Sequence, residues 1–125
     1  MAFVHLHNHT EYSLLDGLTH VKDMVRRAAE LGMPAVAITD HGVMSGVPEL
    51  CDACDAVEKE TGKRVKPIYG CEVYFTTDEE LRKDVKPKLY HLLLLAKTNE
   101  GYHNLLHLVS ESHVDNFYYR PRTTF

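Results

Sequence analysis

Apolar residues gather into four short runs along the chain. Residues 2–6 and 35–39 are brief apolar runs, and residues 67–75 are rich in aromatic and β-branched side chains. Residues 89–96 are almost continuously apolar, which is typical of strands that are buried on both faces. This pattern predicts a strand at each of the four places. The polar stretch 76–88 between the last two predicts a solvated loop.

Three other stretches carry apolar residues at helical spacing. The first helix is expected to begin after Thr19, a residue type that caps helices, and to stop at Gly32. The second is expected to end near Gly62, and the third to begin near Thr98 or Asn99. The apolar stripes that predict these helices are Val21, Met24, Val25 and Ala28; Val47, Leu50, Cys51 and Cys54; and Tyr102, Leu105, Leu106 and Val109.

Strands that alternate with helices indicate an α/β fold with right-handed crossovers. The chain of 125 residues holds about four predicted strands, which is one domain, residues 1–125. A closed (β/α) barrel needs about eight strands and ~250 residues, so a barrel would be present only as its first half. The aromatic ending 117–125 lacks a helix stop, and we expect the domain to continue beyond it.

Composition excludes several classes of protein. Hydrophobic residues make up 44% and charged residues 26%, which is typical of folded soluble proteins. No run approaches the ~20 apolar residues of a membrane span, and no signal peptide is recognisable, which predicts a cytoplasmic protein without a membrane partner. The three cysteines fit a reducing compartment. A net charge of −4 without a basic stripe argues against autonomous binding to nucleic acid.

Histidine is the unusual component, with 9 residues in the chain. His7 and His9 are two positions apart at the end of the first predicted strand, so their imidazoles face the same side. His41 follows the second strand and Glu72 lies near the end of the third; such strand ends form the active-site rim of parallel α/β folds. Imidazole and carboxylate together suit Zn²⁺ or Mn²⁺, which predicts a catalytic metal pocket.

Other metal-competent residues receive different interpretations. His91 begins the fourth predicted strand, and an antiparallel return of that strand beside the third would bring it close to Glu72. His5 is expected to pack or to orient a ligand, and Asp40 to hydrogen-bond a ligand or the backbone.

Two further pairs are expected to be inert. Cys51 and Cys54 share an apolar stripe, which predicts core packing. His103 and His107 lie one helical turn apart but lack the glutamate of an H-E-x-x-H motif, which predicts a solvated face.

Five segments together resemble a known family. In chain order they are HLHNHTEYSLLDG, AITDHG, PIYGCEVYF, YHLLLLAKTNEGYHNLLHLVS and FYYRPR. They are similar to the start of the PHP (polymerase and histidinol phosphatase) domain of bacterial DNA polymerase III alpha subunits, and the likeness spans essentially the whole chain. The short H-x-H and T-D-H signatures are shared with free-standing PHP phosphoesterases, whereas S-L-L-D-G and F-Y-x-x-P-R are typical of the polymerase branch.

The resemblance implies a distorted (β/α)7 TIM-like barrel whose rim holds up to three divalent ions, Zn or Mn with Fe or Mg as alternatives. Asp16 is one of the ligands that the resemblance implies, and its alternative role is to set the turn before Gly17. The family's remaining ligands, a cysteine or histidine and a final Asp-x-His motif, would lie beyond residue 125. By matching position, the metal ligands in this chain are His7, His9, Asp16, His41, Glu72 and His91.

The same resemblance implies metal-dependent phosphoester hydrolysis. His7, His9, His41 and Glu72 would act through bound metal, which makes hydroxide from water near neutral pH. In the polymerase branch the substrate is the DNA 3′ end and the reaction is 3′→5′ exonuclease proofreading. The partners are then the remaining polymerase domains and the replisome subunits.

Two other functions stay open from the sequence. The domain could be a non-catalytic module that stabilises the polymerase and docks partners, or a free-standing phosphatase of the histidinol-phosphate type. Half a barrel would leave sheet edges uncovered, so the chain is also expected to self-associate. The residues Tyr118, Tyr119, Arg120 and Arg122 are expected either to touch DNA phosphate or to form an exposed seam.

Overall fold

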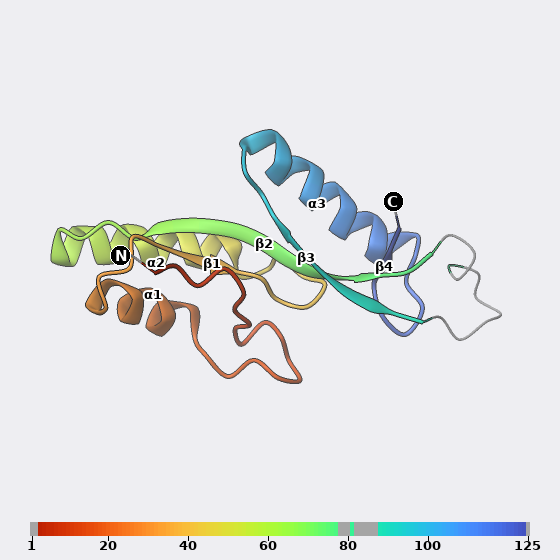
Figure 1. The fold of residues 1–125 in the computed structure, drawn as a ribbon, viewed down its shortest axis with the longest axis horizontal. Helices are drawn as coiled ribbons and strands as arrows, with labels where there is room; N and C mark the ends of the chain where they lie inside the picture. The colour runs from red at the N-terminus through yellow and green to blue at the C-terminus, as the bar shows by residue number, and fades with distance from the viewer. Residues whose placement is uncertain (1–2, 78–80, 82–87, 125) are drawn as a thin grey trace.

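The computed structural model describes residues 3–77, 81 and 88–124 (Figure 1). In these residues, helices and strands form a mixed α/β arrangement, as the apolar pattern predicts, and β3 follows β2 directly in the order of elements. The elements are α1 (Val21–Glu30), β1 (Ala35–Ile38), α2 (Val47–Thr61), β2 (Lys66–Phe75), β3 (Tyr90–Leu95), α3 (Asn99–Val114) and β4 (Arg122–Thr123). Within the described residues, no helix has both the length and the apolar character needed to cross a membrane.

The strand β2 is the centre of the sheet. Its first residues pair with β1 in parallel, and its last residues pair with β4 in parallel. The strand β3 pairs with it in antiparallel orientation, which confirms the expected return and sets His91 opposite Tyr74. The described strands form one open sheet, so the half-barrel stays a prediction.

Two apolar clusters hold the helices on the sheet. The first core lies between α1, α2 and β1 and includes Val21, Val25 and Leu50, each fully buried. The second core is smaller and joins β2 to α3 through Cys71, Val73, Leu105 and Val109. In Figure 1, α1 and α2 accordingly lie at the β1 end of the sheet, whereas α3 lies at the other end.

The helix boundaries agree closely with the sequence, with one difference. Gly62 ends α2 with φ 69°, and the Thr98 hydroxyl accepts from the Gly101 backbone N–H at 3.1 Å at the start of α3. The residue before α1 is His20 rather than Thr19, and its side chain makes no capping bond. Instead, the Glu11 carboxylate accepts from the backbone N–H of Val21 at 3.0 Å.

The first predicted strand is wrong for the described residues 3–6, which form no regular ladder. Isolated bonds tie this segment to β1, from Ala37 N–H to the His5 carbonyl and from Thr39 N–H to the Asn8 carbonyl. The Asn8 side-chain amide donates to the carbonyls of both His5 and Ala37. The Asn8 side chain thus occupies carbonyls that would accept backbone hydrogen bonds in a regular ladder. The segment is therefore extended but irregular.

Two further expectations concern β3 and the loop before it. The strand is not buried on both faces: Leu92 to Leu94 are half-buried and Leu95 is exposed. Only β2 pairs with it among the described strands, so its other edge and part of its face stay open. The predicted solvated loop 76–88 lies mostly outside the described residues.

Candidate metal centre

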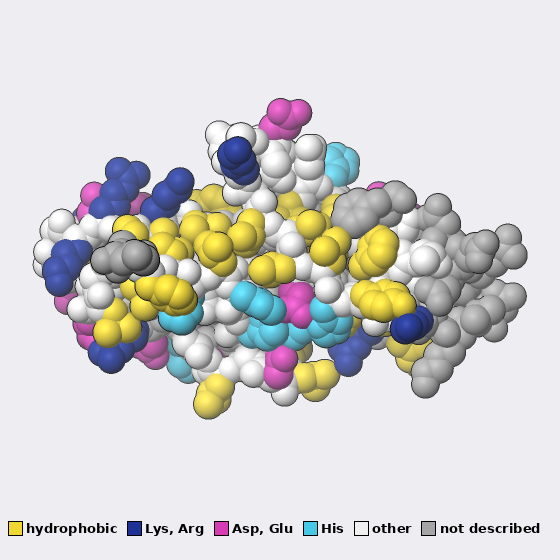
Figure 2. Space-filling view, in the orientation of Figure 1, with side chains coloured by type: hydrophobic (Ala, Val, Ile, Leu, Met, Phe, Trp, Pro, Cys, Tyr) yellow, Lys and Arg dark blue, Asp and Glu magenta, His cyan; other side chains and the backbone are white. Residues whose placement is uncertain are grey.

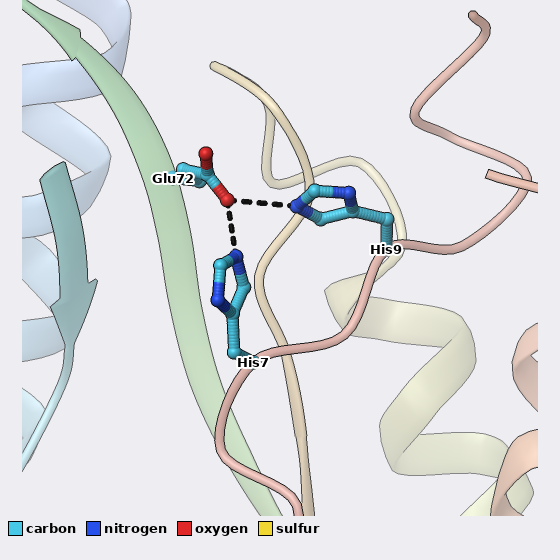
Figure 3. Close-up of side chains that lie close together, drawn as sticks. All are labelled: His7, His9 and Glu72. Carbon is cyan, nitrogen blue, oxygen red and sulfur yellow. Dashed lines mark hydrogen bonds and ion pairs between the residues drawn. The ribbon is translucent and has the colours of Figure 1, made fainter. Parts of the chain in front are cut away.

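The carboxylate of Glu72 contacts imidazoles from two separate parts of the chain. Its Oε2 contacts Nε2 of His7 and lies 2.8 Å from Nε2 of His9 (Figure 3). Its Oε1 lies 2.5 Å from Nδ1 of His91. The side chain of Glu72 is only 6% exposed, so these contacts form at the bottom of the cluster. Figure 3 shows both N-terminal imidazoles pointing at the carboxylate from the irregular segment before α1.

A second carboxylate, Asp16, closes the cluster on the solvent side. Its Oδ2 lies 3.0 Å from Nε2 of His41 and 3.4 Å from Nδ1 of His9. Half of the Asp16 side chain is exposed, in contrast to Glu72. The cluster therefore has one buried and one open carboxylate.

The structure brings all six sequence-predicted ligands together. Three overlapping groups have their donor atoms within 4.8 Å of one another, so that each could hold a metal ion. Each of His9, His41 and Glu72 belongs to two groups, which makes one connected set of sites. The groups are His7, His9 and Glu72; His9, Asp16 and His41; and His41, Glu72 and His91.

The backbone after β1 aligns His41 with Glu72. Glu72 N–H donates to the Asp40 carbonyl at 3.0 Å, and Gly42 N–H donates to the Glu72 carbonyl at 2.9 Å. This parallel bridge continues the β1–β2 ladder beyond the last residue of β1. Gly42 has φ 64°, a left-handed conformation that glycine adopts without steric cost.

Asp40 lies behind the cluster and belongs to none of the three groups. Its carboxylate accepts from the Thr10 backbone N–H at 2.6 Å, the Thr10 hydroxyl at 2.8 Å and the Ser13 hydroxyl at 2.6 Å. The Ser13 oxygen in turn accepts from the His41 backbone N–H at 3.1 Å. Asp40 thus ties the loop that leads to Asp16 onto the strand end that carries His41.

His5 also lies outside the three groups. Its ring meets the ring of Phe3 edge-on, with centroids 4.7 Å apart. The structure therefore places it with an aromatic neighbour and away from the carboxylates.

Burial and hydrogen bonding act in opposite directions on the pKa of Glu72. Burial raises the pKa, but the contacts with His9, His7 and His91 lower it more, so that it falls from an ordinary 4.5 to about 2. The contact with His41 lowers the pKa of Asp16 as well. Both carboxylates are consequently ionised at neutral pH and can neutralise a cation.

The donor atoms of His41 fit a metal ion. Its Nδ1 is buried without a hydrogen-bond partner in the described part of the chain, and the nearest carboxylate oxygen, on Glu72, is 3.6 Å away. Buried polar atoms normally have a partner, and a cation shared with Glu72 would supply one. Imidazole and carboxylate donors of this kind are suited to zinc, manganese or iron.

The cluster opens on the molecular surface. Figure 2 shows histidine and acidic side chains gathered in the middle of one face, between hydrophobic side chains. A cleft of about 480 Å³ lies beside them. Its lining includes Asp16, His41, His91, Leu14, Leu15, Tyr74 and Arg120.

Sequence reasoning missed Tyr74 as part of this site. Its ring stacks with His41 at 5.9 Å between centroids and meets His91 edge-on at 5.0 Å. Strand periodicity was the available signal, because Tyr74 is two residues after Glu72 and shares its face of β2.

The expectation for Arg122 is wrong. This residue is 1% exposed, and its guanidinium donates to the carbonyls of Asn116 at 3.0 Å and Leu81 at 2.8 Å. It therefore holds the C-terminal segment in place and is neither a phosphate contact nor part of an exposed seam. Tyr119 and Arg120 are exposed.

The two pairs expected to be inert lie outside the candidate groups. Cys54 is buried in the first core, and this burial raises its pKa to about 11, while Cys51 is half-buried with its sulfur 3.1 Å from the Tyr69 hydroxyl. His103 and His107 are exposed on α3. The predictions of core packing for Cys54 and of a solvated face for the two histidines are confirmed.

Comparison with known proteins agrees with this geometry. The family model described as PHP domain matches residues 5–125. DNA polymerase III subunit alpha of Helicobacter pylori is 46% identical over 121 residues, covering 97% of this chain and 10% of the relative. The same subunit of Treponema pallidum is 40% identical over 125 residues, covering 98% of this chain and 10% of the relative. The chain thus spans about a tenth of the length of these curated relatives.

A solved structure supports the fold. It is the crystal structure of a Bifidobacterium adolescentis protein assigned as a metal-dependent phosphoesterase, with a TM-score of 0.55 and 24% sequence identity. The match covers 90% of this chain and 34% of that protein. At this identity the likeness concerns the fold alone.

Proposed function

This chain belongs to the PHP domain family, and we propose that it forms the metal-binding part of a phosphoesterase site within a DNA polymerase III alpha subunit. One observation carries the proposal. A buried, ionised carboxylate contacts three imidazoles, while a fourth imidazole has a buried nitrogen without a hydrogen-bond partner among the described residues. The buried nitrogen of His41 is costly without a partner, and a cation shared with Glu72 would supply one.

Six side chains would hold the metal ions. Glu72 and Asp16 supply negative charge, because the contacts with histidines keep both pKa values low. The imidazoles would supply nitrogen donor atoms, since those of His7 and His9 face Glu72 and those of His41 face both carboxylates. When bound, divalent metal lowers the pKa of a coordinated water and stabilises the charge of a phosphate ester under attack.

The protein's own residues determine where the reaction takes place. Asp40 and Ser13 fix the His41 backbone, which keeps the ligands in position before a substrate arrives. The exposed Asp16 and His91 border the cleft, so the substrate phosphate would approach from that side. The buried Glu72 carboxylate stays ionised across the neutral pH range and would not compete as a proton donor.

In finer detail, we propose phosphodiester hydrolysis at the 3′ end of DNA, which is 3′→5′ proofreading for the polymerase. The polymerase relatives support DNA as the substrate class, and the remaining polymerase and replisome subunits would be the partners. Zinc or manganese suits the mixed imidazole and carboxylate donors best, with iron or magnesium as alternatives.

The test compares two double variants of the chain. His7→Ala with His9→Ala removes ligands of two groups, whereas His103→Ala with His107→Ala removes two exposed histidines of α3. Elemental analysis after dialysis should give bound metal for the wild type and the α3 variant but little for the His7/His9 variant. Release of the 3′ nucleotide from a labelled single-stranded oligonucleotide should follow the same order.

Equal metal content in all three proteins would refute the proposed centre. If the wild type instead binds metal that the His7/His9 variant loses and yet hydrolyses no substrate, that result would favour the structural-module function.

A further inference from the structure

One basic side chain borders the cleft beside the candidate metal centre. Among the described residues that line the cleft, Arg120 is the only lysine or arginine. Its guanidinium lies 5.5 Å from the centre of the Tyr74 ring. Within the described ranges the guanidinium makes no hydrogen bond or ion pair, so its donors are available to a ligand.

The backbone before Arg120 is bent into an unusual turn. Tyr119 has φ 59°, the only positive value at a non-glycine residue in the described part of the chain. The neighbouring residues close the turn through a bond from Tyr118 N–H to the Arg120 carbonyl at 3.1 Å. A left-handed tyrosine costs conformational energy, and such residues persist where the surrounding structure fixes them.

The residues after Arg120 supply that fixation. Pro121 packs so closely on Gly42 that a Cβ added to Gly42 would lie 2.7 Å from its Cγ. Arg122 is buried and hydrogen-bonded, and it pairs with Tyr74 in the β2–β4 ladder. The guanidinium of Arg120 therefore extends from an anchored turn and is not an ordinary surface arginine.

Tyr74 links this arginine to the metal-binding imidazoles. The same ring contacts the guanidinium, stacks with His41 and meets His91 edge-on. One aromatic ring thus separates Arg120 from the candidate centre. Because Arg120, His41 and His91 line the same cleft, a nucleic-acid strand lying along it could present one phosphate to the candidate centre and the next to the guanidinium.

We propose that Arg120 binds the phosphate adjacent to the one that is cleaved, and so selects strands of nucleic acid over single phosphate esters. A planar guanidinium can donate two parallel hydrogen bonds to a phosphate, which an ammonium group cannot. The assignment rests on the proposed function, because the cleaved phosphate defines which neighbour Arg120 contacts. It is a role in substrate specificity and takes no part in the proton or electron movements of hydrolysis.

The first arm of the test measures binding without catalysis. A fluorescein-labelled single-stranded oligonucleotide is titrated with the metal-free chain at several salt concentrations, and anisotropy reports the affinity. Loss of one phosphate contact to a single strand should lower the slope of log affinity against log salt by about 0.7 in Arg120→Ala. Arg64→Ala, which removes an exposed arginine away from the cleft, is the control and should keep the wild-type slope.

The second arm uses the metal-loaded chain and two substrates. Arg120→Ala should raise the KM for the oligonucleotide about tenfold, as expected for a charged hydrogen-bond donor, and leave the kcat nearly unchanged. The KM for bis(p-nitrophenyl) phosphate, which has one phosphate, should not change. Arg120→Lys should retain the salt slope but only part of the oligonucleotide affinity.

The outcomes separate this inference from the proposed function. A wild-type salt slope in Arg120→Ala, or an equal loss in Arg64→Ala, would overturn the role of Arg120. An equal rise in KM for both substrates in Arg120→Ala would overturn the adjacent-phosphate assignment. A wild-type chain that hydrolyses neither substrate would count against the proposed function, and the binding arm would still decide whether Arg120 contacts phosphate.

Discussion

The two ends of the sheet differ in how completely they are packed. At the β1 end, the first core encloses Leu50 and Ile38, which are 0% and 2% exposed, between two helices. At the β3 end, the second core has one helix, and Leu94 and Leu108 are only half-buried beside it. The strand β2 runs through both ends and carries Glu72 between them.

This difference divides the candidate ligands into two kinds. His41 follows β1 at the well-packed end and Glu72 lies between the two ends, and their side chains are 16% and 6% exposed. His7 and His91 come from the irregular N-terminal segment and from β3, and about half of each side chain is exposed. Under the proposed function, the buried ligands would set the geometry of the site, and the exposed ligands would border the surface from which metal and substrate arrive.

The largest expected effect tests the packing of the two ends directly. Leu50→Ala should lower the free energy of unfolding by about 2–5 kcal/mol, because it leaves a cavity in a closed core. Leu94→Ala removes the same atoms from a half-buried position and should cost about 1 kcal/mol. Urea unfolding followed by circular dichroism measures both. Equal losses would mean that the β3 end is packed as tightly as the β1 end.

The next prediction compares two glycines that both have a left-handed backbone. Gly62 has open space around it, whereas Gly42 is closely packed. Gly62 ends α2 with φ 69°, and an added Cβ would meet nothing within 4 Å, so Gly62→Ala should cost about 1 kcal/mol from backbone strain. Gly42 has a similar φ of 64°, but its Cβ would collide with Pro121. Gly42→Ala should therefore cost about 2–4 kcal/mol. Similar costs in urea unfolding would show that the Arg120 turn moves freely away from Gly42.

A smaller effect concerns the carboxylate that joins the two ends. Because its pKa falls from 4.5 to about 2 on folding, ionised Glu72 stabilises the folded chain fully above pH 4.5. This contribution is lost as the pH falls from 4.5 towards 2. In the presence of a chelator, the unfolding free energy of wild type should decline more steeply over this range than that of Glu72→Gln. Parallel pH profiles would mean that the histidines do not stabilise the charged form.

Sequence reasoning succeeded where a local pattern determines the structure. The stripes through Val25, Leu50 and Leu105 predict three helices, and the turn chemistry of Gly62 and Thr98 predicts their ends. His41, Glu72 and His91 were predictable for a similar reason, because strand ends bring distant residues to one rim. Sequence reasoning wrongly placed His7 and His9 at the end of a strand, and it reached Asp16 only through the family resemblance. It failed for Arg122, whose burial depends on carbonyls of Asn116 and Leu81 that no sequence spacing reveals.

The smallest expected effect concerns the start of α1, where the sequence pattern predicts the wrong capping residue. Thr98 caps α3 through its own side chain, so Thr98→Ala should cost about 1 kcal/mol. Thr19 has the same residue type before a helix, but Glu11 makes the corresponding contact with Val21. Thr19→Ala should thus change the unfolding free energy by less than about 0.5 kcal/mol. Glu11→Ala should instead show the loss of a cap, about 1 kcal/mol, since the Val21 N–H then loses its acceptor. If Thr19→Ala lowered the unfolding free energy as much as Thr98→Ala, Thr19 would be the cap of α1, as the sequence pattern predicts.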